Sequence, residues 1–251
     1  MFTVRRHEER TPRGHGKHEG WLTFSPANAA DPLAGGLGSL EILSEDRLLP
    51  GAAVPAEPAH DSEIVTFVRE GAVAYRDSTG RSGVISAGEF QRLTSSRGVR
   101  HEASNASRVD GAHVFQIWLR LSRADLESTQ EQKRFSTAER RSGLCVVAAP
   151  NAQRGSLRVH PDALVYSALL EPGQHVVHEL AHDRSAWLHL VEGEAALGDL
   201  VLSTGDGVAI ELDRAVSVTA RKATELLLID VSNPRSLRRD SGSNGGPAET
   251  I

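Results

Sequence analysis

Short runs of apolar residues, separated by Gly, Asp, Pro and Ser, occur along most of the chain. In EIVTFVREGAVAYRDSTG (63–80), two apolar runs flank Glu70-Gly71, and a polar stretch containing glycine follows. This pattern predicts a strand, a tight turn, a second strand and a further turn. GVISAGEFQRL (83–93) and AHVFQIWLRL (112–121) predict more strands. The N-terminal half is therefore expected to be a β-sheet domain.

The second half of the chain repeats this organisation. FVREGAVAY (67–75) and the later ISAGEFQRL have counterparts in LVEGEAAL (190–197) and the later STGDGVAI. Each pair reads as a strand, a Glu-Gly turn, a strand and then a turn of small, Gly and acidic residues. This internal duplication predicts two all-β barrels or sandwiches in tandem. The polar residues 120–143 form a connecting segment.

Composition narrows the class of protein. The 251 residues can form one large or two small cores, and 39% hydrophobic with 24% charged residues is ordinary for a globular chain. A net charge of −5 with both signs mixed predicts no nucleic-acid partner. No apolar run approaches the roughly 20 residues of a membrane span. The N-terminus also lacks the apolar segment of a signal peptide. We therefore expect a cytoplasmic protein with no membrane partner.

His178-Glu179-Leu180-Ala181-His182 matches the H-E-x-x-H pattern of zinc proteases. That site requires a helix, in which residues four apart lie on one face about 6 Å apart. Here the motif follows Pro172-Gly173 and runs into a predicted hairpin, and four residues of a strand span roughly 13 Å. His178 and His182 are therefore not expected to share a metal ion, and the sequence does not predict a protease.

Several segments together resemble the pirin-like bicupins, in particular their bacterial quercetinase-type branch. The resemblance is carried by RGHGKHEGWLTFSPAN, EIVTFVREGAVAYRDSTG, SAGEFQRLTSSRGVRHEASN and GSLRVHPDALVYSALL, and it extends to about residue 231. It implies an all-β fold of two facing cupin barrels, with the active site in the first. The implied domains are the barrels 1–119 and 144–231, the connecting segment 120–143 and a disordered tail 232–251.

The resemblance also implies a metal site, from which this sequence departs. In the family pattern an H-x-H pair and an H-x-E pair on two strands hold one divalent metal. Here the first pair falls on Glu57 and Ala59, and the second on His101 and Ala103. Three of the four ligand positions have changed, so we predict no cofactor. The alternative is one Fe or Ni ion held by a fallback set, which is Glu57, His60, Glu63 and His101.

Loss of the ligands would leave a cavity with two alanines on its walls, suited to a small apolar or amphipathic molecule. His101 and Glu57 are the candidate catalytic groups, because they are the polar residues left at the ligand positions. The candidate substrate-binding residues are Ala59, Glu63, Phe67, Phe90, Gln91, Ala103, Gln116 and Trp118.

Three hypotheses for the function follow. The first is a metal-independent enzyme that folds a flexible substrate for intramolecular cyclisation, of the cycloaddition type, or for isomerisation in natural-product biosynthesis. The second is a metal-dependent oxygenase of the quercetin 2,3-dioxygenase type, which the resemblance implies. The third is a non-enzymatic binding or regulatory protein, for which a pocket plugged by side chains is expected. The resemblance implies a monomer or a weak dimer.

Overall fold

The computed structural model describes residues 1–25, 30–54, 61–95, 100–121, 123 and 126–233. Strands make up nearly all of its regular structure. The helical elements are short, and they are η1 (His7–Glu9), α1 (Thr137–Arg141) and η2 (Gln153–Gly155). The prediction of an all-β fold is confirmed.

Two antiparallel sheets form the N-terminal domain, with strand orders β11-β8-β5-β10-β4-β3-β2 and β7-β6-β9. The strands of the larger sheet are β2 (Thr11–Arg13), β3 (His18–Leu22), β4 (Leu40–Leu48), β5 (Ser62–Glu70), β8 (Glu89–Ser95), β10 (Ala112–Arg120) and β11 (Gln130–Arg134), and those of the smaller sheet are β6 (Ala72–Asp77), β7 (Ser82–Ser86) and β9 (His101–Asn105). Gly71 carries the chain from β5 to β6. Its φ is 73°, and a Cβ there would lie 2.4 Å from the Gly111 carbonyl oxygen, so the turn requires glycine.

The C-terminal domain repeats this plan, with strand orders β1-β19-β16-β21-β14-β12-β13 and β15-β20-β17-β18. The strands of its larger sheet are β1 (Phe2–Arg5), β12 (Cys145–Ala149), β13 (Leu157–Arg158), β14 (Ala163–Leu170), β16 (Arg184–Glu192), β19 (Gly207–Ile210) and β21 (Thr224–Ser232), and those of its smaller sheet are β15 (His175–Glu179), β17 (Glu194–Leu197), β18 (Leu200–Ser203) and β20 (Ala215–Ala220). The predicted duplication is therefore present in the fold.

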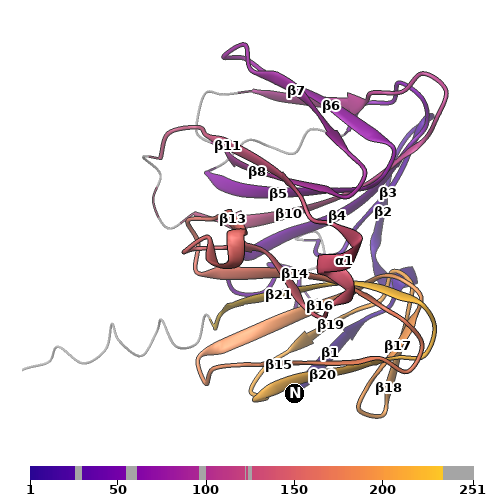
Figure 1. Cartoon of the computed structure of the whole chain (residues 1–251), viewed down its shortest axis with the longest axis vertical. Helices are drawn as coiled ribbons and strands as arrows, with labels where there is room; N and C mark the ends of the chain where they lie inside the picture. Colours follow the sequence, from indigo (N-terminus) through magenta and orange to yellow (C-terminus); the bar gives the residue numbers. More distant parts are fainter. Residues whose placement is uncertain (26–29, 55–60, 96–99, 122, 124–125, 234–251) are drawn as a thin grey trace, which may run out of the picture.

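Figure 1 shows that the two larger sheets lie in the middle of the molecule and face each other, while the two smaller sheets lie outside them. A continuous apolar core fills the space between the larger sheets. Phe67 and Phe115 contribute to it from the N-terminal domain, and Trp187 and Ile229 contribute from the C-terminal domain. Burial of these large side chains holds the two barrels face to face. The predicted bicupin architecture is confirmed.

The predicted domain boundaries differ from the structure at two places. Residues 2–5 form β1, which pairs with β19 and so belongs to the C-terminal sheet rather than to the first barrel. The predicted connecting segment 120–143 contains β11, which extends the large N-terminal sheet beside β8, and the short helix α1. Hydrophobic periodicity could not reveal either pairing, because β1 has only four residues and β11 is polar. The predicted disordered tail lies outside the described residues from 234 onward.

The interiors of the two barrels differ. Buried aliphatic side chains from both sheets fill the C-terminal barrel, among them Leu188, Leu190, Leu202 and Leu228. The corresponding cluster in the N-terminal barrel has fewer members and gathers near one end, around Val68 and Val114. This asymmetry leaves room for a pocket in the N-terminal barrel.

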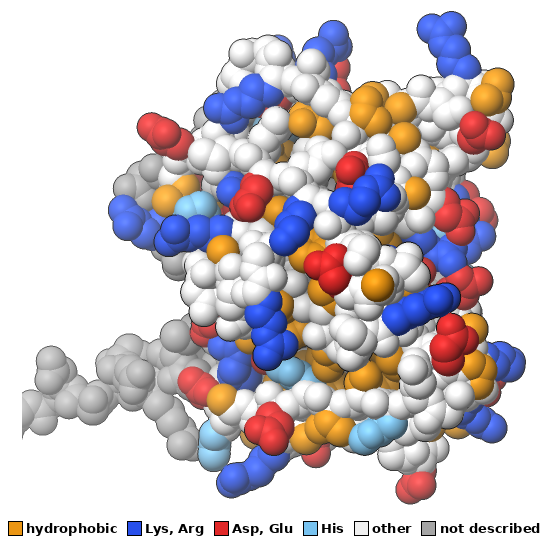
Figure 2. Space-filling model, viewed as in Figure 1, with side chains coloured by type: hydrophobic (Ala, Val, Ile, Leu, Met, Phe, Trp, Pro, Cys, Tyr) orange, Lys and Arg blue, Asp and Glu red, His pale blue; other side chains and the backbone are white. Residues whose placement is uncertain are grey.

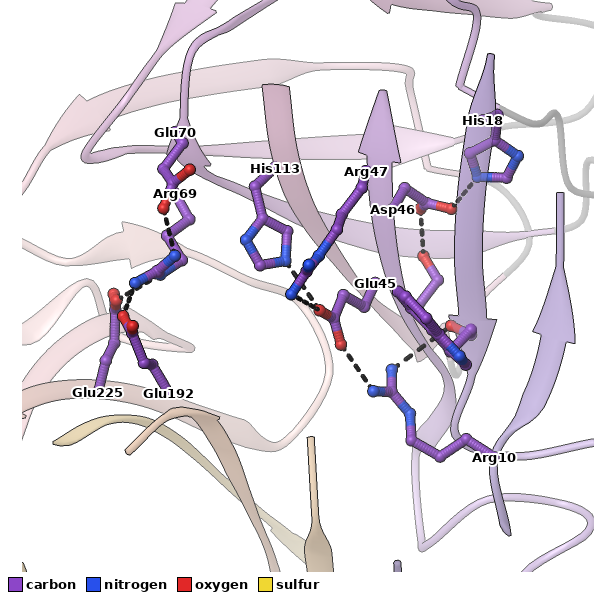
Figure 3. Close-up of polar contacts among 12 residues, drawn as sticks. Arg10, His18, Glu45, Asp46, Arg47, Arg69, Glu70, His113, Glu192 and Glu225 are labelled. Atoms are coloured by element: carbon purple, nitrogen blue, oxygen red, sulfur yellow. Dashed lines mark hydrogen bonds and ion pairs between the residues drawn. The ribbon is translucent and has the colours of Figure 1, made fainter. Parts of the chain in front are cut away.

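Polar contacts also join the two domains. Arg69 on β5 is paired with Glu192 and Glu225 of the C-terminal domain, and its Nε lies 2.9 Å from Glu225 Oε2 (Figure 3). Arg140 on α1 is buried, binds Glu225, and lies 5.0 Å from the centre of the Phe67 ring. Glu225 therefore links a strand of the first barrel, the connecting segment and a strand of the second barrel.

None of the helices in the described ranges is long and apolar enough to cross a membrane. On the face drawn in Figure 2, Lys and Arg side chains are interspersed with Asp and Glu. The absence of nucleic-acid and membrane partners, a cytoplasmic location and a monomeric or weakly dimeric state remain predictions from the sequence.

His189 on β16 is fully buried between the two domains. Within the described residues neither of its ring nitrogens has a hydrogen-bond partner. Burial, with the nearby positive charge of Arg10 adding to it, lowers the pKa of His189 to about 3. The imidazole is therefore neutral in the folded protein, whereas in the unfolded chain it takes up a proton near pH 6.5.

This difference predicts a pH-dependent loss of stability. Because the folded pKa lies below the unfolded one, the contribution of His189 is fully present above pH 6.5 and falls as the pH drops toward 3. Between pH 7.5 and 5 the loss should be about 2 kcal/mol. The His189→Leu variant has no imidazole to protonate at this position. Its unfolding free energy should therefore fall by about 2 kcal/mol less than that of the wild type between pH 7.5 and 5. Urea unfolding of both proteins at the two pH values measures it, and equal pH dependences would contradict the assignment.

Candidate active site

A pocket lies in the N-terminal barrel, between the large and small sheets. Its cavity volume is about 100 Å³, and it opens to solvent at its mouth. The lining residues are Val54, Ile64, Thr66, Val73, Tyr75, Arg76, Ile85, Gln91, Leu93, Ser95, His101, Glu102, Ala103, Val114, Gln116, Trp118 and Gln130. Most of the wall is apolar, with amide, hydroxyl and imidazole groups placed on it. Such a surface suits a small aromatic molecule that carries a few polar groups.

Strand alternation determines which residues face this pocket. On β10 the residues Val114, Gln116 and Trp118 line it, while the residues between them belong to the core between the domains. Gln91 on β8 and Ala103 on β9 also line it. The structure thus places Gln91, Ala103, Gln116 and Trp118, four of the predicted substrate-binding residues, on the pocket wall.

Glu63 does not lie in the pocket, contrary to our prediction. It is fully buried on the opposite face of β5, where its carboxylate accepts hydrogen bonds from Thr94 Oγ1 at 2.9 Å and from the backbone N–H of His160 at 3.0 Å. His160 belongs to the C-terminal domain, and its Nδ1 lies 2.7 Å from Glu63 Oε2. The neighbouring Ile64 faces the pocket instead. A register one residue away from the expected one reverses the two faces of the strand.

Phe67 and Phe90 were also predicted to bind the substrate, and the structure contradicts this. Their rings stack on each other at 4.4 Å between centres and belong to the core between the domains. Gln91 follows Phe90 on the same strand, so only one of the two can face the pocket. The apolar member faces the core between the sheets, where burial of an aromatic ring is most favourable.

Among the described residues, His101 is the histidine of the pocket wall. It is half-buried on β9, and its Nε2 is shielded from solvent without a hydrogen-bond partner among the described residues. Burial lowers the pKa of His101, against the opposing effect of Asp77. The imidazole is therefore neutral near pH 7, with a lone pair available to a metal ion or to the proton of an acidic hydroxyl group.

Glu102, next to His101, lies at the mouth of the pocket rather than in its interior. Its side chain is 71% exposed and pairs with Arg76 at 2.8 Å at the rim. The predicted site residues Glu57, Ala59 and His60 lie outside the described residues, and their roles stay predictions.

Sequence reasoning missed Tyr75 and Gln130. Tyr75 lies two residues after Val73 on β6, and both side chains are on the face of the strand that lines the pocket. The period of two in the predicted hairpin could therefore have indicated Tyr75. Gln130 lies on β11 in the polar connecting segment, and its side-chain Nε2 donates to the Tyr75 hydroxyl at 3.0 Å. Its position depends on the pairing of β11 with β8, for which the sequence offered no signal.

The geometry of the pocket shows which of the described residues could hold a metal ion. Within the described ranges, no group of three or more His, Cys, Asp or Glu side chains is arranged to hold an ion. His101 offers one suitable nitrogen, while Glu63 of the fallback set is occupied on the other face of its strand. The described residues alone therefore do not form a complete metal site.

The H-E-x-x-H segment behaves as expected from its surroundings. His175–Glu179 is the strand β15, paired with β20. The Nε2 of His178 lies 2.6 Å from Asp230 Oδ2, whereas His182 lies in the following turn and is exposed. The two histidines do not form a helical zinc site, which confirms that reading.

Comparison with known proteins gives matches in both halves of the chain. Residues 4–119 match the family model described as pirin, and residues 146–231 match the model described as the quercetinase C-terminal cupin domain. Quercetin 2,3-dioxygenase of Escherichia coli K12 is 35% identical over 231 residues, which cover 92% of this chain and 99% of that protein. A putative quercetin 2,3-dioxygenase of Pseudomonas aeruginosa is 31% identical over 224 residues, with 87% and 96% covered.

Among solved structures, bacterial pirin YhhW of E. coli in complex with nickel(II) superposes with a TM-score of 0.85 at 34% identity. The match covers 93% of this chain and 100% of that one. This finding contradicts our prediction that the chain takes no cofactor and points to the alternative, a single metal ion. None of these relatives is described as a cyclase or an isomerase. With both family models matched and full-length relatives above 30% identity, the chain belongs to the pirin family of bicupins.

Proposed function

We propose that the chain is a metal-dependent oxygenase of the quercetin 2,3-dioxygenase type and that its reaction takes place in the N-terminal pocket. The observation that carries this proposal is His101, whose neutral imidazole presents a buried Nε2 without a hydrogen-bond partner among the described residues. Relatives named quercetin 2,3-dioxygenase and the nickel(II) complex of a similar pirin support the same reading.

His101 would be one protein ligand of the metal. The other residues that the sequence offers near the ligand positions, Glu57 and His60, lie outside the described residues and have to be tested by substitution. A divalent metal bound there would act as a Lewis acid toward an oxygen atom of the substrate.

The pocket walls supply the remaining functions. Ile64, Val114 and Trp118 offer an apolar surface that excludes water and can pack against the flat rings of a flavonol. The amides of Gln91 and Gln116 can donate to and accept from its hydroxyl and carbonyl groups. A planar, polyhydroxylated aromatic substrate therefore matches the chemistry of the wall better than an aliphatic or highly charged one.

The non-enzymatic hypothesis predicted a pocket plugged by side chains. The N-terminal pocket is open, whereas the C-terminal barrel is filled by aliphatic residues. This difference favours a small-molecule function for the first barrel. Nothing in the described residues or in the relatives favours a cyclisation or isomerisation.

Metal loading followed by an oxygen-uptake assay tests the proposal. The protein is measured for metal content by plasma mass spectrometry as isolated and after loading with Ni, Fe, Mn, Zn or Cu and dialysis. We expect near-stoichiometric retention of at least one metal, and loss of quercetin absorbance with equimolar O₂ consumption by that form. Removal of the metal with a chelator should stop the reaction. A protein that retains no metal and leaves quercetin unchanged would overturn the proposal.

A further inference from the structure

Tyr75 occupies a position on the pocket wall that depends on small neighbours. It lies on β6, the central strand of the small sheet, directly opposite Gly83 of β7 and Ala103 of β9. A Cβ at residue 83 would lie 2.5 Å from the Tyr75 Oη and 2.7 Å from Cζ. Since any larger residue at 83 would displace the ring, Gly83 provides the space in which Tyr75 lies.

Ala103 is the cross-strand neighbour of Tyr75 on the other side. It is one of the positions at which the sequence departs from the metal-ligand pattern, and it lies next to Tyr75 across the sheet. His101 is two residues away on β9 and lines the same wall. His101 is therefore a diagonal neighbour of Tyr75 across the sheet. Such neighbours lie about 7–8 Å apart, so a single aromatic ligand can contact both side chains.

The hydroxyl group of Tyr75 is oriented by Gln130, whose Nε2 donates to it at 3.0 Å. A phenol oxygen that accepts this bond still has its own proton to donate. No acceptor for that proton is present among the described residues, and Tyr75 is only partly buried at the pocket wall. The proton is therefore available to a molecule in the pocket.

We propose that Tyr75, oriented by Gln130 and accommodated by Gly83, is a substrate-binding hydrogen-bond donor. Its partner would be an acceptor oxygen of the ligand, either a carbonyl or an ionised hydroxyl group. This inference rests on the proposed function, because it uses the same pocket and the same class of aromatic ligand. It adds a binding group from the small sheet and gives the connecting segment a role in ligand recognition through Gln130.

The chain contains only two tyrosines, Tyr75 and Tyr166, which makes a direct test practical. Tyr166 lies in the C-terminal domain, where its ring is 4.8 Å from that of His178, and it serves as the matched control. The full chain is labelled with 3-fluorotyrosine, and Tyr166→Phe assigns the remaining fluorine resonance to Tyr75. Anaerobic addition of quercetin should shift the Tyr75 resonance and leave that of Tyr166 in place.

Binding constants complete the test. Tyr75→Phe keeps the ring and removes the hydroxyl, so the Kd for quercetin should rise about two- to tenfold, whereas Tyr166→Phe should leave it unchanged. Gly83→Ala should shift the Tyr75 resonance even without ligand, because the added Cβ meets the ring. Quercetin that binds equally well to the wild type and Tyr75→Phe, with no shift at Tyr75, would overturn this inference alone. Failure of quercetin to bind any of the proteins would overturn the inference together with its choice of substrate.

Discussion

Replacing His101 by alanine should lower kcat/KM for quercetin at least about 100-fold in the metal-loaded protein. The imidazole is the titratable group on the pocket wall that burial holds neutral, and its Nε2 has no competing hydrogen bond among the described residues. Alanine removes the nitrogen and leaves the strand β9 otherwise unchanged. The measurement is the initial rate of quercetin loss, with the metal content of each preparation determined in parallel.

The matched control is His175→Ala. His175 is an exposed histidine on β15 of the other barrel, with its Nε2 2.8 Å from Ser217 Oγ. It should retain the wild-type rate and metal content. Equal rates for His101→Ala and the wild type would remove His101 from the reaction and with it the observation on which the proposed function rests.

Glu45→Ala should have the largest effect on stability, lowering the free energy of unfolding by about 3–5 kcal/mol. Glu45 on β4 is buried between Arg10 and His113, with Arg10 Nη1 at 2.6 Å and His113 Nε2 at 2.9 Å (Figure 3). Burial alone would raise its pKa, but the contacts with His113 and Arg10 outweigh this and lower it below the usual range. Without the carboxylate, the fully buried side chain of Arg10 loses its charged partner.

Urea unfolding of the wild type and the variant at neutral pH measures this loss. The control, Glu102→Ala, removes the carboxylate of an exposed pair with Arg76, and the unfolding midpoint should stay at the wild-type value. A Glu45→Ala protein with the stability of the wild type would show that the buried arginine finds another partner or is solvated.

The sequence predicted the β class, the duplication and the bicupin architecture because these depend on patterns within each half of the chain. The Glu-Gly turns and the apolar runs around them are local signals, and Gly71 and Gly193 occupy equivalent turns in the two barrels. The pairing of β1 with β19 joins the N-terminus to residues about 200 positions later, and no local pattern encodes it.

For the candidate site, the sequence identified the right strands but not always the right face. The predicted substrate-binding set contained Glu63 and Phe90 as well as Gln91, Gln116 and Trp118. Adjacent residues of a strand point to opposite faces, so Phe90 and Gln91 cannot both line the pocket. Phe90 faces the second barrel and Gln91 faces the pocket, because the large sheet of the second barrel provides the apolar surface against which Phe90 packs. That surface cannot be inferred from the N-terminal domain alone.

The error about the cofactor has a different origin. The prediction of no metal assumed that changes at three ligand positions abolish binding, whereas a pirin at 34% identity binds nickel(II). The structure excludes Glu63 as a replacement ligand, because that carboxylate contacts Thr94 and His160 between the domains. The ligands that would accompany His101 are therefore the part of the site that most needs direct observation.

The most direct test of the proposed site is anomalous diffraction at the nickel edge from crystals of the full chain grown with Ni²⁺. We expect an anomalous difference peak in the N-terminal pocket, beside His101. Nickel-loaded crystals with no peak in that pocket, or with a peak only at the His178–Asp230 pair of the C-terminal barrel, would contradict it.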